Sequence, residues 1–192
     1  MTPRSFIIFG TLSVAVGALT MPVEAQAVHC QFRGAPEALA DRPSPLDSVS
    51  IRLGDGEAKL CYGRPSARGR TMIGGVDPLG QPWRMGANEP TTLHVPFQAR
   101  LGSVDLEPGA YSLYAIPGAT EWTIVVNANV NRWGIPISPD VRSSDVGSFV
   151  VQPTESPEHE EMLTFSFVGA DAAGILTFRW EGAVWDVAFS RR

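Results

Sequence analysis

The sequence has few of the side chains that hold transition metals in proteins. It contains 3 His and 2 Cys in 192 residues, and no two histidines stand at the His-x-His or His-x-x-x-His spacing. His94 alone falls within a strand pattern, whereas we interpret the segments around His29 and His159 as a tail and a loop. We therefore expect neither a preformed metal site nor a cofactor.

Common catalytic and nucleotide-binding motifs are also missing. The chain has no Gly-x-Ser-x-Gly elbow to present a nucleophilic serine. Gly74-Gly75 is followed by neither the lysine nor the helix of a phosphate-binding loop. There is no basic excess, because 15 Lys and Arg oppose 20 Asp and Glu and leave a formal charge of −5. Nucleic acid and anionic membrane surfaces are therefore not expected as partners.

Long hydrophobic runs are limited to the N-terminus. Phe6–Leu19 is largely apolar, but it is shorter than the roughly 20 residues that cross a bilayer as a helix. Ala25-Gln26-Ala27 supplies the small-x-small pattern that signal peptidase cleaves after. The sequence thus predicts a signal peptide over residues 1–27 and a secreted or periplasmic protein, with no membrane span in the mature chain.

The two cysteines are then expected to meet an oxidising compartment. Two thiols there pair more often than they stay free, so we predict a disulfide between Cys30 and Cys61. The alternative is a buried, free Cys61 and a reactive Cys30 in a mobile tail. A nucleophilic role for Cys61 has little support, because no histidine is near it in the sequence.

Short runs of alternating apolar and polar residues dominate the rest of the chain. Val49–Leu53 and Ala58–Tyr62 flank Gly54-Asp55-Gly56 and predict a β-hairpin. Most gaps between runs are too short for parallel crossovers. We predict an all-β domain over residues 48–192, a mainly antiparallel β-sandwich or jelly-roll-like barrel, after an extended leader at 28–47. Further strands are predicted near residues 93–97, 101–106, 111–116, 122–126, 148–152, 163–168, 175–180 and 184–189.

Three details of this pattern can be checked directly. Glu155–Glu161 is interpreted as a solvated acidic loop. Residues 169–174 and Glu181-Gly182 are interpreted as hairpin turns. The second turn would make Trp180 and Trp185 cross-strand partners in the core.

Residues 63–90 are rich in Arg, Gly and Pro and follow no sustained period. Such a length is too great for a passive connection, so we interpret it as a structured loop. Guanidinium groups bind carboxylate, sulfate or phosphate through paired hydrogen bonds, and tryptophan offers a stacking face. A pocket for a small anion or a saccharide is one interpretation; the other is that the arginines fix the loop to carbonyls and acids. The candidate ligand-binding residues are Arg64, Arg68, Arg70, Trp83, Arg84, Asn88 and Glu89, with Trp133 from a second, asparagine-rich loop.

Glu89 is also the candidate for catalysis. A hydrolase would use it as acid or base, with Arg70 or Arg84 stabilising negative charge that develops on the substrate. The sequence has no complete set of nucleophile, base and orienting group, so a binding or scaffold role is favoured over an enzymatic one.

The same residues carry a resemblance to a known family. The segments Tyr62–Arg70, Trp83–Thr92, Gly109–Gly118 and Glu121–Thr123, followed by Trp133-Gly134, stand in an ordered pattern. The chain resembles the domain-of-unknown-function 2911 family of secreted bacterial proteins from about Ser44 to Phe189. That resemblance implies an exported domain and brings no established activity or catalytic residue. The ligand and the oligomeric state stay open.

Overall fold

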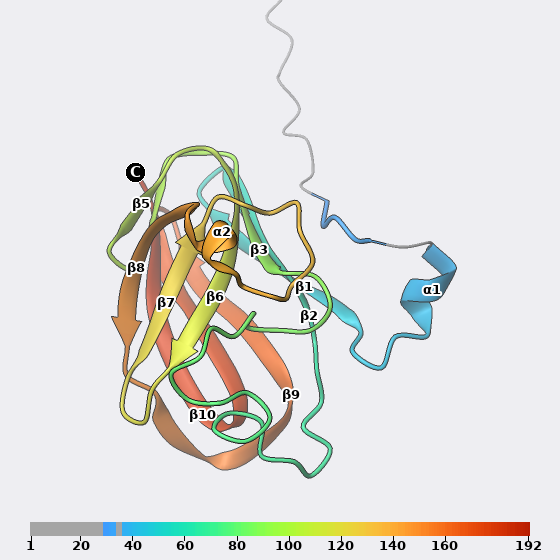
Figure 1. The fold of residues 1–192 in the computed structure, drawn as a ribbon. Helices are drawn as coiled ribbons and strands as arrows, with labels where there is room; N and C mark the ends of the chain where they lie inside the picture. The colour runs from blue at the N-terminus through green and yellow to red at the C-terminus, as the bar shows by residue number, and fades with distance from the viewer. Residues whose placement is uncertain (1–28, 34–35) are drawn as a thin grey trace, which may run out of the picture.

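The protein folds as a sandwich of two antiparallel β-sheets (Figure 1). A computed structural model describes residues 29–33 and 36–192, so the signal peptide predicted at 1–27 lies outside the described residues. The larger sheet has six strands in the order β1-β2-β3-β6-β7-β8, and the smaller has four in the order β5-β4-β10-β9. The strands are β1 (Leu46–Leu53), β2 (Gly56–Gly63), β3 (Thr91–Val95), β4 (Ala99–Leu101), β5 (Val104–Leu106), β6 (Gly109–Pro117), β7 (Trp122–Asn127), β8 (Asp145–Val151), β9 (Thr154–Ala170) and β10 (Ala173–Arg191). The helices are α1 (Pro36–Ala40) and α2 (Pro139–Arg142).

The all-β, mainly antiparallel prediction is therefore confirmed. Each sheet has two edge strands and does not close on itself. Of the two predicted architectures, the β-sandwich is therefore the one observed. The hairpin around Gly54-Asp55 is also present, with Leu53 paired to Gly56. No helix among the described residues has the length and hydropathy needed to cross a bilayer.

The larger sheet separates apolar from polar side chains. Successive side chains of a strand point to opposite faces, whereas residues paired across strands share a face. The core face carries Leu60 and its partner Leu93, which are fully buried. On the outer face, Cys61 pairs with Thr92 and Thr92 with Ser112. A row of small and polar side chains thus crosses β2, β3 and β6.

Stacked aromatic rings fill the space between the sheets. Trp83 lies parallel to Trp180, with ring centroids 5.5 Å apart, and Phe178 lies parallel to Trp185 at 5.0 Å. Trp180 and Trp185 are both buried, but they belong to one strand, β10. The prediction that they face each other across a hairpin is therefore wrong, although their place in the core is correct.

The two longest strands correct other details of the sequence interpretation. Residues 181–182 are not a turn, because β10 continues through them and the register with β9 shifts on both sides of Glu181. Glu155–Glu161 is part of β9 rather than a loop. The predicted hairpin at 169–174 is present but tighter, because β9 extends to Ala170 and β10 begins at Ala173.

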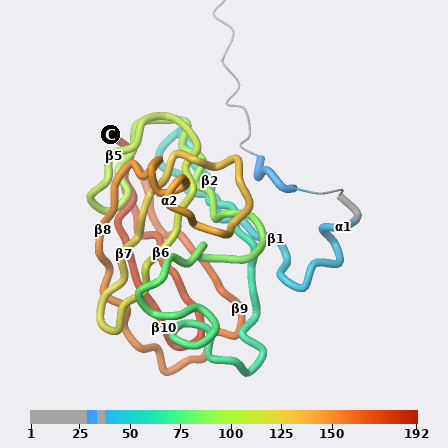
Figure 2. Tube along the Cα trace, in the orientation of Figure 1, coloured from blue at the N-terminus to red at the C-terminus, as the bar shows by residue number. Residues whose placement is uncertain are grey.

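The predicted disulfide is present and attaches the N-terminal segment to the larger sheet. The Cα atoms of Cys30 and Cys61 are 5.7 Å apart, so residues 31–33 lie beside the outer face of β2 and β3. The chain then passes through α1, which stands out beside β1 in Figure 2. Strand β1 of the larger sheet begins at Leu46, so residues 46–47, the last two of the predicted leader, belong to the sheet.

Candidate functional site

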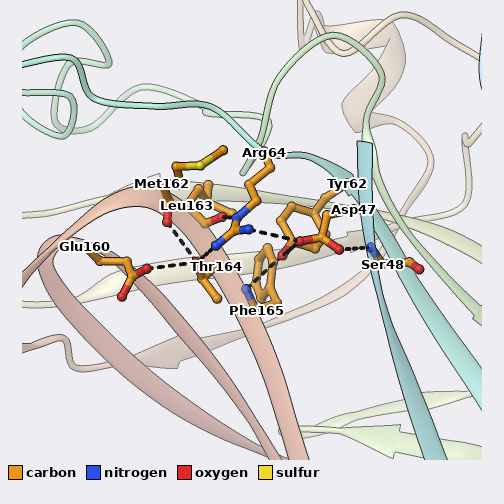
Figure 3. Close-up of polar contacts among 9 residues, drawn as sticks. All are labelled: Asp47, Ser48, Tyr62, Arg64, Glu160, Met162, Leu163, Thr164 and Phe165. Carbon is orange, nitrogen blue, oxygen red and sulfur yellow. Dashed lines mark hydrogen bonds and ion pairs between the residues drawn. The ribbon is translucent and has the colours of Figure 1, made fainter. Parts of the chain in front are cut away.

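Residues 63–90, called the arginine loop below, run from β2 to β3 of the larger sheet (Figure 2) and contact β9 and β10 of the smaller sheet on the way. Arg64 shows how the loop is attached (Figure 3). Its Nε donates to the carbonyl of Leu163 at 3.1 Å, and its Nη2 donates to Thr164 Oγ1 at 2.8 Å. Its Nη1 lies 3.7 Å from a carboxylate oxygen of Asp47. Arg64 thus connects the end of β2 to β9 and β1.

Tyr62 reinforces the same junction. Its hydroxyl donates to Asp47 Oδ2 at 3.1 Å and accepts the amide hydrogen of Phe165 at 3.2 Å. Burial raises the pKa of Tyr62 to about 12, and the neighbouring Asp47 carboxylate also contributes. The phenol is therefore protonated at neutral pH, and it serves the fold as a hydrogen-bonding group.

Arg68 and Arg70 also bond to backbone carbonyls. Arg68 Nη2 donates to Pro43 O at 3.1 Å. Arg70 Nε donates to Ala67 O at 2.9 Å, and its Nη2 donates to Ser66 O at 3.2 Å. Such contacts are expected if the arginines fix the loop to the rest of the chain.

The two aromatic candidates occupy different environments. Trp83 is 4% exposed and packs among the core rings, so a ligand at the surface would not reach its face. Trp133 is 44% exposed and stands on the loop between β7 and α2. Only Trp133 is therefore placed to stack on a ligand.

The arginine loop and the loop that bears Trp133 are in direct contact. The amide of Gly134 donates to the carbonyl of Asn88 at 3.0 Å. A Cβ atom at position 134 would lie 2.4 Å from that carbonyl oxygen and 2.6 Å from Arg84 Cδ, so only glycine fits there. Arg84 itself donates from Nε to Gly86 O at 3.0 Å. Burial lowers the pKa of Arg84, and the negative charge of Asp77 partly offsets this effect.

Glu89 is buried beneath the N-terminal segment. Its carboxylate accepts hydrogen bonds from Arg42 Nη1 at 2.7 Å, Arg42 Nη2 at 3.0 Å and the Arg33 amide at 2.9 Å. Burial alone would raise the pKa of Glu89, but these bonds outweigh it and hold the pKa below its ordinary value. Such a carboxylate is ionised and already occupied, which makes it a poor proton donor.

A cavity of about 230 Å³ opens next to Glu89 on the outer face of the larger sheet. Thr92, His94 and Ala110 on β3 and β6 lie on one side of it. The N-terminal segment covers another side, and the loop after β7 closes a third. The lining residues are Gln31, Phe32, Arg33, Glu89, Pro90, Thr92, His94, Ala110, Val130, Asn131 and Arg132.

Arg132 is the cation of this cavity, and it is 9% exposed. Its Nη1 donates to the carbonyls of Trp133 at 3.1 Å and Gly134 at 2.9 Å, and its Nη2 donates to Ser112 Oγ at 3.3 Å. Its Nε is buried with no hydrogen-bond partner. Among residues 29–33 and 36–192, Arg132 makes no ion pair within 4.0 Å, and burial lowers its pKa. A buried guanidinium without a carboxylate is costly unless an anion compensates it.

His94 and Thr92 add neutral polar groups. His94 Nε2 lies 3.2 Å from Thr92 Oγ1. Burial lowers the pKa of His94 from its ordinary value of 6.5, and the charge of Lys59 lowers it further. His94 is therefore neutral at pH 7 and offers a hydrogen bond rather than a second charge.

A larger cavity, of about 410 Å³, lies at the other end of β6. It is bordered by Trp122, Leu79 and Glu181. The Glu181 carboxylate accepts the amide hydrogens of Met72 and Ile73 at 2.9 and 3.1 Å. Because its carboxylate is engaged in this way, the larger cavity offers no buried polar group in search of a partner, and the smaller one is the better candidate.

The structure thus brings together only part of the predicted set. Glu89 lines the cavity, and Asn88 and Arg84 support the adjoining loop. Arg64 and Arg70 lie elsewhere in the arginine loop, where they bond to the chain itself. Arg132 was missed, although the neighbouring Trp133 had been singled out. Its burial without an ion pair among the described residues depends on the fold, and the acidic residue that acts on its pKa is Asp145. No group of three or more His, Cys, Asp or Glu side chains within the described part of the chain could hold a metal ion.

Fold and cavity together define a class: a two-sheet antiparallel β-sandwich with a small cationic cavity on the outer face of its larger sheet. Comparison of the sequence with models of known protein families identifies the family. The model described as a protein of unknown function (DUF2911) matches residues 44–189, and the chain belongs to this family. No curated protein and no solved structure gives a significant match.

Proposed function

We propose that this protein is an exported binding module that holds a small anionic ligand in the cavity beside Arg132. The observation that carries the proposal is the buried Arg132 guanidinium, which has an unpartnered Nε and no ion pair among the described residues. An anion in the cavity would compensate the buried charge of Arg132.

Export is supported by two independent features. The N-terminal sequence has the apolar run and small-x-small motif of a signal peptide. The Cys30–Cys61 disulfide belongs to an oxidising compartment, because cytosolic thiols are kept reduced.

The distribution of charge also favours an anion. The whole chain carries −5, yet the cavity is lined by Arg33 and Arg132, and its lining carboxylate, Glu89, is already bound by Arg42. A saccharide without charge is less well supported, because the exposed Trp133 does not line the cavity. The cavity therefore fits an acid better than a neutral sugar.

Titration calorimetry on the exported protein tests this proposal. Sodium acetate, phosphate and glucuronate would be titrated at constant ionic strength. We expect saturable binding of at least one of them, and about tenfold weaker binding by Arg132→Lys, which keeps the charge but loses the planar fork. Arg132→Met should abolish it, whereas Arg179→Met, which removes an exposed arginine on β10, should bind like the wild type.

Circular dichroism and tryptophan fluorescence would establish that each variant is folded. If Arg132→Met does not fold, Arg132→Lys carries the comparison. Absence of binding for all three anions, or equal affinity in the wild type and Arg132→Lys, would overturn the proposal.

A further inference from the structure

We infer that two copies of this protein pair through the free edge of β8, so that their larger sheets join into one continuous sheet. This inference is independent of the anion site and concerns a different surface, the edge of the larger sheet that β8 forms (Figure 1). It follows from three properties of β8: its unused backbone groups, its uncharged sequence and a register in which two copies match.

The direction of the backbone hydrogen bonds in the larger sheet can be followed from β6 to β8. Ala115 on β6 exchanges two backbone hydrogen bonds with Trp83, at 2.7 and 2.8 Å, so its groups point away from β7. The bonding direction alternates along antiparallel strands. Ile124, the β7 partner of Ala115, therefore bonds to its other partner, Phe149 on β8.

The outer edge of β8 is consequently left with unused groups. Ser148 and Val150, on either side of Phe149, direct their N–H and C=O groups outwards, and Val146 has no register partner on β7. Within the described part of the chain, no backbone hydrogen bond joins β8 to any strand other than β7. An unpaired edge of this kind is a template for a strand of another chain.

The sequence of β8 does not protect this edge. Residues 146–151 have no charged side chain and no proline, and their valine and phenylalanine residues favour extended chains. Val146 and Val150 are 46% and 54% exposed. Native strand edges are usually protected by charge, short length or a covering segment, and β8 is therefore open to a partner strand.

The other three edge strands have such protection. β1 carries Arg52, whose side chain is 79% exposed. β5 has three residues, and its Asp105 is bound to Arg100. The edge of β9 is partly covered by the arginine loop, because the amide of Ala67 donates to the carbonyl of Glu161 at 2.9 Å. Pairing between sheets is thus expected at β8.

A second copy of this chain is the partner that β8 fits. An antiparallel pairing centred on Ser148 sets the two Ser148 residues against each other. Val146 then lies opposite Val150 of the other copy, and Gly147 lies opposite Phe149. The exposed valines cover each other, as β-branched cross-strand pairs do. A register centred on Phe149 would instead set each Val150 against Ser148.

Charge and size determine how strong this dimer is. Asp145 is the one charged residue of β8, and the antiparallel arrangement keeps its two copies at opposite ends of the paired strands. Six residues form an edge about 20 Å long, which is small beside an interface that buries roughly 800 Å² per partner. The charge of −5 on each chain opposes association at low salt. We therefore expect a weak dimer in exchange with the monomer.

Sedimentation velocity on the exported protein tests the pairing, at protein concentrations from about 0.01 to 1 mM and at low and high salt. We expect the dimer fraction to rise with both. Ser148→Lys sets two ammonium groups against each other and should weaken the dimer by about tenfold or more. Ser50→Lys makes the same change at an exposed serine on β1, the other edge strand of the larger sheet, and should leave the dimer unchanged.

Single cysteine variants test the register. The two native cysteines are joined to each other, so each variant carries one free thiol. Ser148→Cys should form an intermolecular disulfide in mild oxidant, because paired Cα atoms lie about 5.5 Å apart. Val150→Cys alone should not, because its two copies would be about 14 Å apart. A mixture of Val150→Cys with Val146→Cys should cross-link.

The results can contradict the pairing or its register separately. Circular dichroism verifies that each variant is folded, and Val150→Lys, at an exposed position, replaces Ser148→Lys if that variant does not fold. A monomer at every concentration, or a dimer that the lysine on β8 leaves unchanged, would overturn pairing through β8. Cross-linking of Val150→Cys alone as fast as Ser148→Cys would overturn the register centred on Ser148.

Discussion

Glu89 lies where three parts of the chain meet. Arg33 precedes α1, Arg42 follows it, and Glu89 stands two residues before β3. Three hydrogen bonds to one buried carboxylate hold these parts together. The residue proposed for catalysis on sequence grounds thus has a structural task, which can be measured.

Glu89→Gln should destabilise the fold at neutral pH. The amide can still accept from Arg33, but it leaves the Arg42 guanidinium without its counter-charge. We expect a loss of about 1–3 kcal/mol in the free energy of unfolding, measured by urea denaturation at pH 7. Glu158→Gln, an exposed position on β9, should change little.

The effect should depend on pH in a defined direction. Because the folded-state pKa of Glu89 lies below its ordinary value of 4.5, its contribution to stability is complete above that value. The contribution is lost as the pH falls through the folded-state pKa. The difference between the wild type and Glu89→Gln should therefore shrink towards acid pH, and a difference that stays constant to pH 3 would contradict the ion-pair role.

At the scale of single residues, the sequence predicts only part of the candidate site. It draws attention to guanidinium groups, and two of its candidate residues belong near the cavity: Glu89 lines it, and the loop that bears Trp133 contributes Val130, Asn131 and Arg132 to it. It does not separate Arg64, which bonds to Leu163 and Thr164, from Arg132, whose Nε has no partner. That distinction depends on contacts between residues about one hundred positions apart, which no local pattern encodes.

Among the elements, β10 is long because the strand continues through residues 181–182. The chain is irregular there and has the local features of a turn. Glu181 has a φ of 53°, and Gly182 follows it. Positive φ beside a glycine is typical both of two-residue hairpin turns and of bulges, so the sequence leaves the two indistinguishable. Here the strand continues, and the Glu181 side chain reaches the arginine loop.

Glu181→Ala should loosen that loop without unfolding the sandwich. It removes the acceptor of the Met72 and Ile73 amides, which are 2.9 and 3.1 Å from the carboxylate. We expect a cost of about 1–3 kcal/mol and faster hydrogen exchange at these two amides. The amides of β6, which bond to β3 and β7, should keep their protection.

Glu155→Ala provides the matched control, because this exposed residue lies on β9 opposite Ala183. It should leave both exchange rates unchanged. Unchanged exchange in Glu181→Ala as well would show that the bulge does not hold the loop.

Strand prediction succeeded where one face is buried and the other exposed. The β1–β2 hairpin has such alternation, and Tyr111–Ile116 of β6 was recognised from an apolar run whose residues 113–115 are all buried. It failed at Glu155–Glu161, because most of these residues are exposed on both faces of β9 and no period remains to be read. A pairing partner, rather than burial, makes that segment a strand.

For the whole molecule, the disulfide joins the N-terminal segment to the sandwich and so completes the cavity. Cys30 is held to Cys61 on β2, and the next three residues, 31–33, all line the cavity. Two attachments therefore hold this side of the cavity in place: the disulfide, which persists in an oxidising environment, and the contacts of Glu89 with Arg33 and Arg42.

Reduction of the disulfide should lower both stability and anion binding. The bond closes a loop with a sequence separation of 31, for which chain entropy gives about 3–4 kcal/mol in the free energy of unfolding. Glu89 still holds Arg33 and Arg42 after reduction, so the folded sandwich should survive. We expect a lower melting temperature in reductant and weaker anion binding, because residues 31–33, which line the cavity, lose one of their attachments.

The double variant Cys30→Ser/Cys61→Ser reproduces the reduced state without reductant and should match it in both measurements. Wild type in reductant with unchanged melting would contradict a stabilising disulfide. Lower melting with unchanged anion affinity would instead show that the Glu89 contacts alone keep the N-terminal segment over the cavity. Combining the double variant with Glu89→Gln then decides between the two attachments, because loss of both releases that segment and should weaken anion binding more than either change alone.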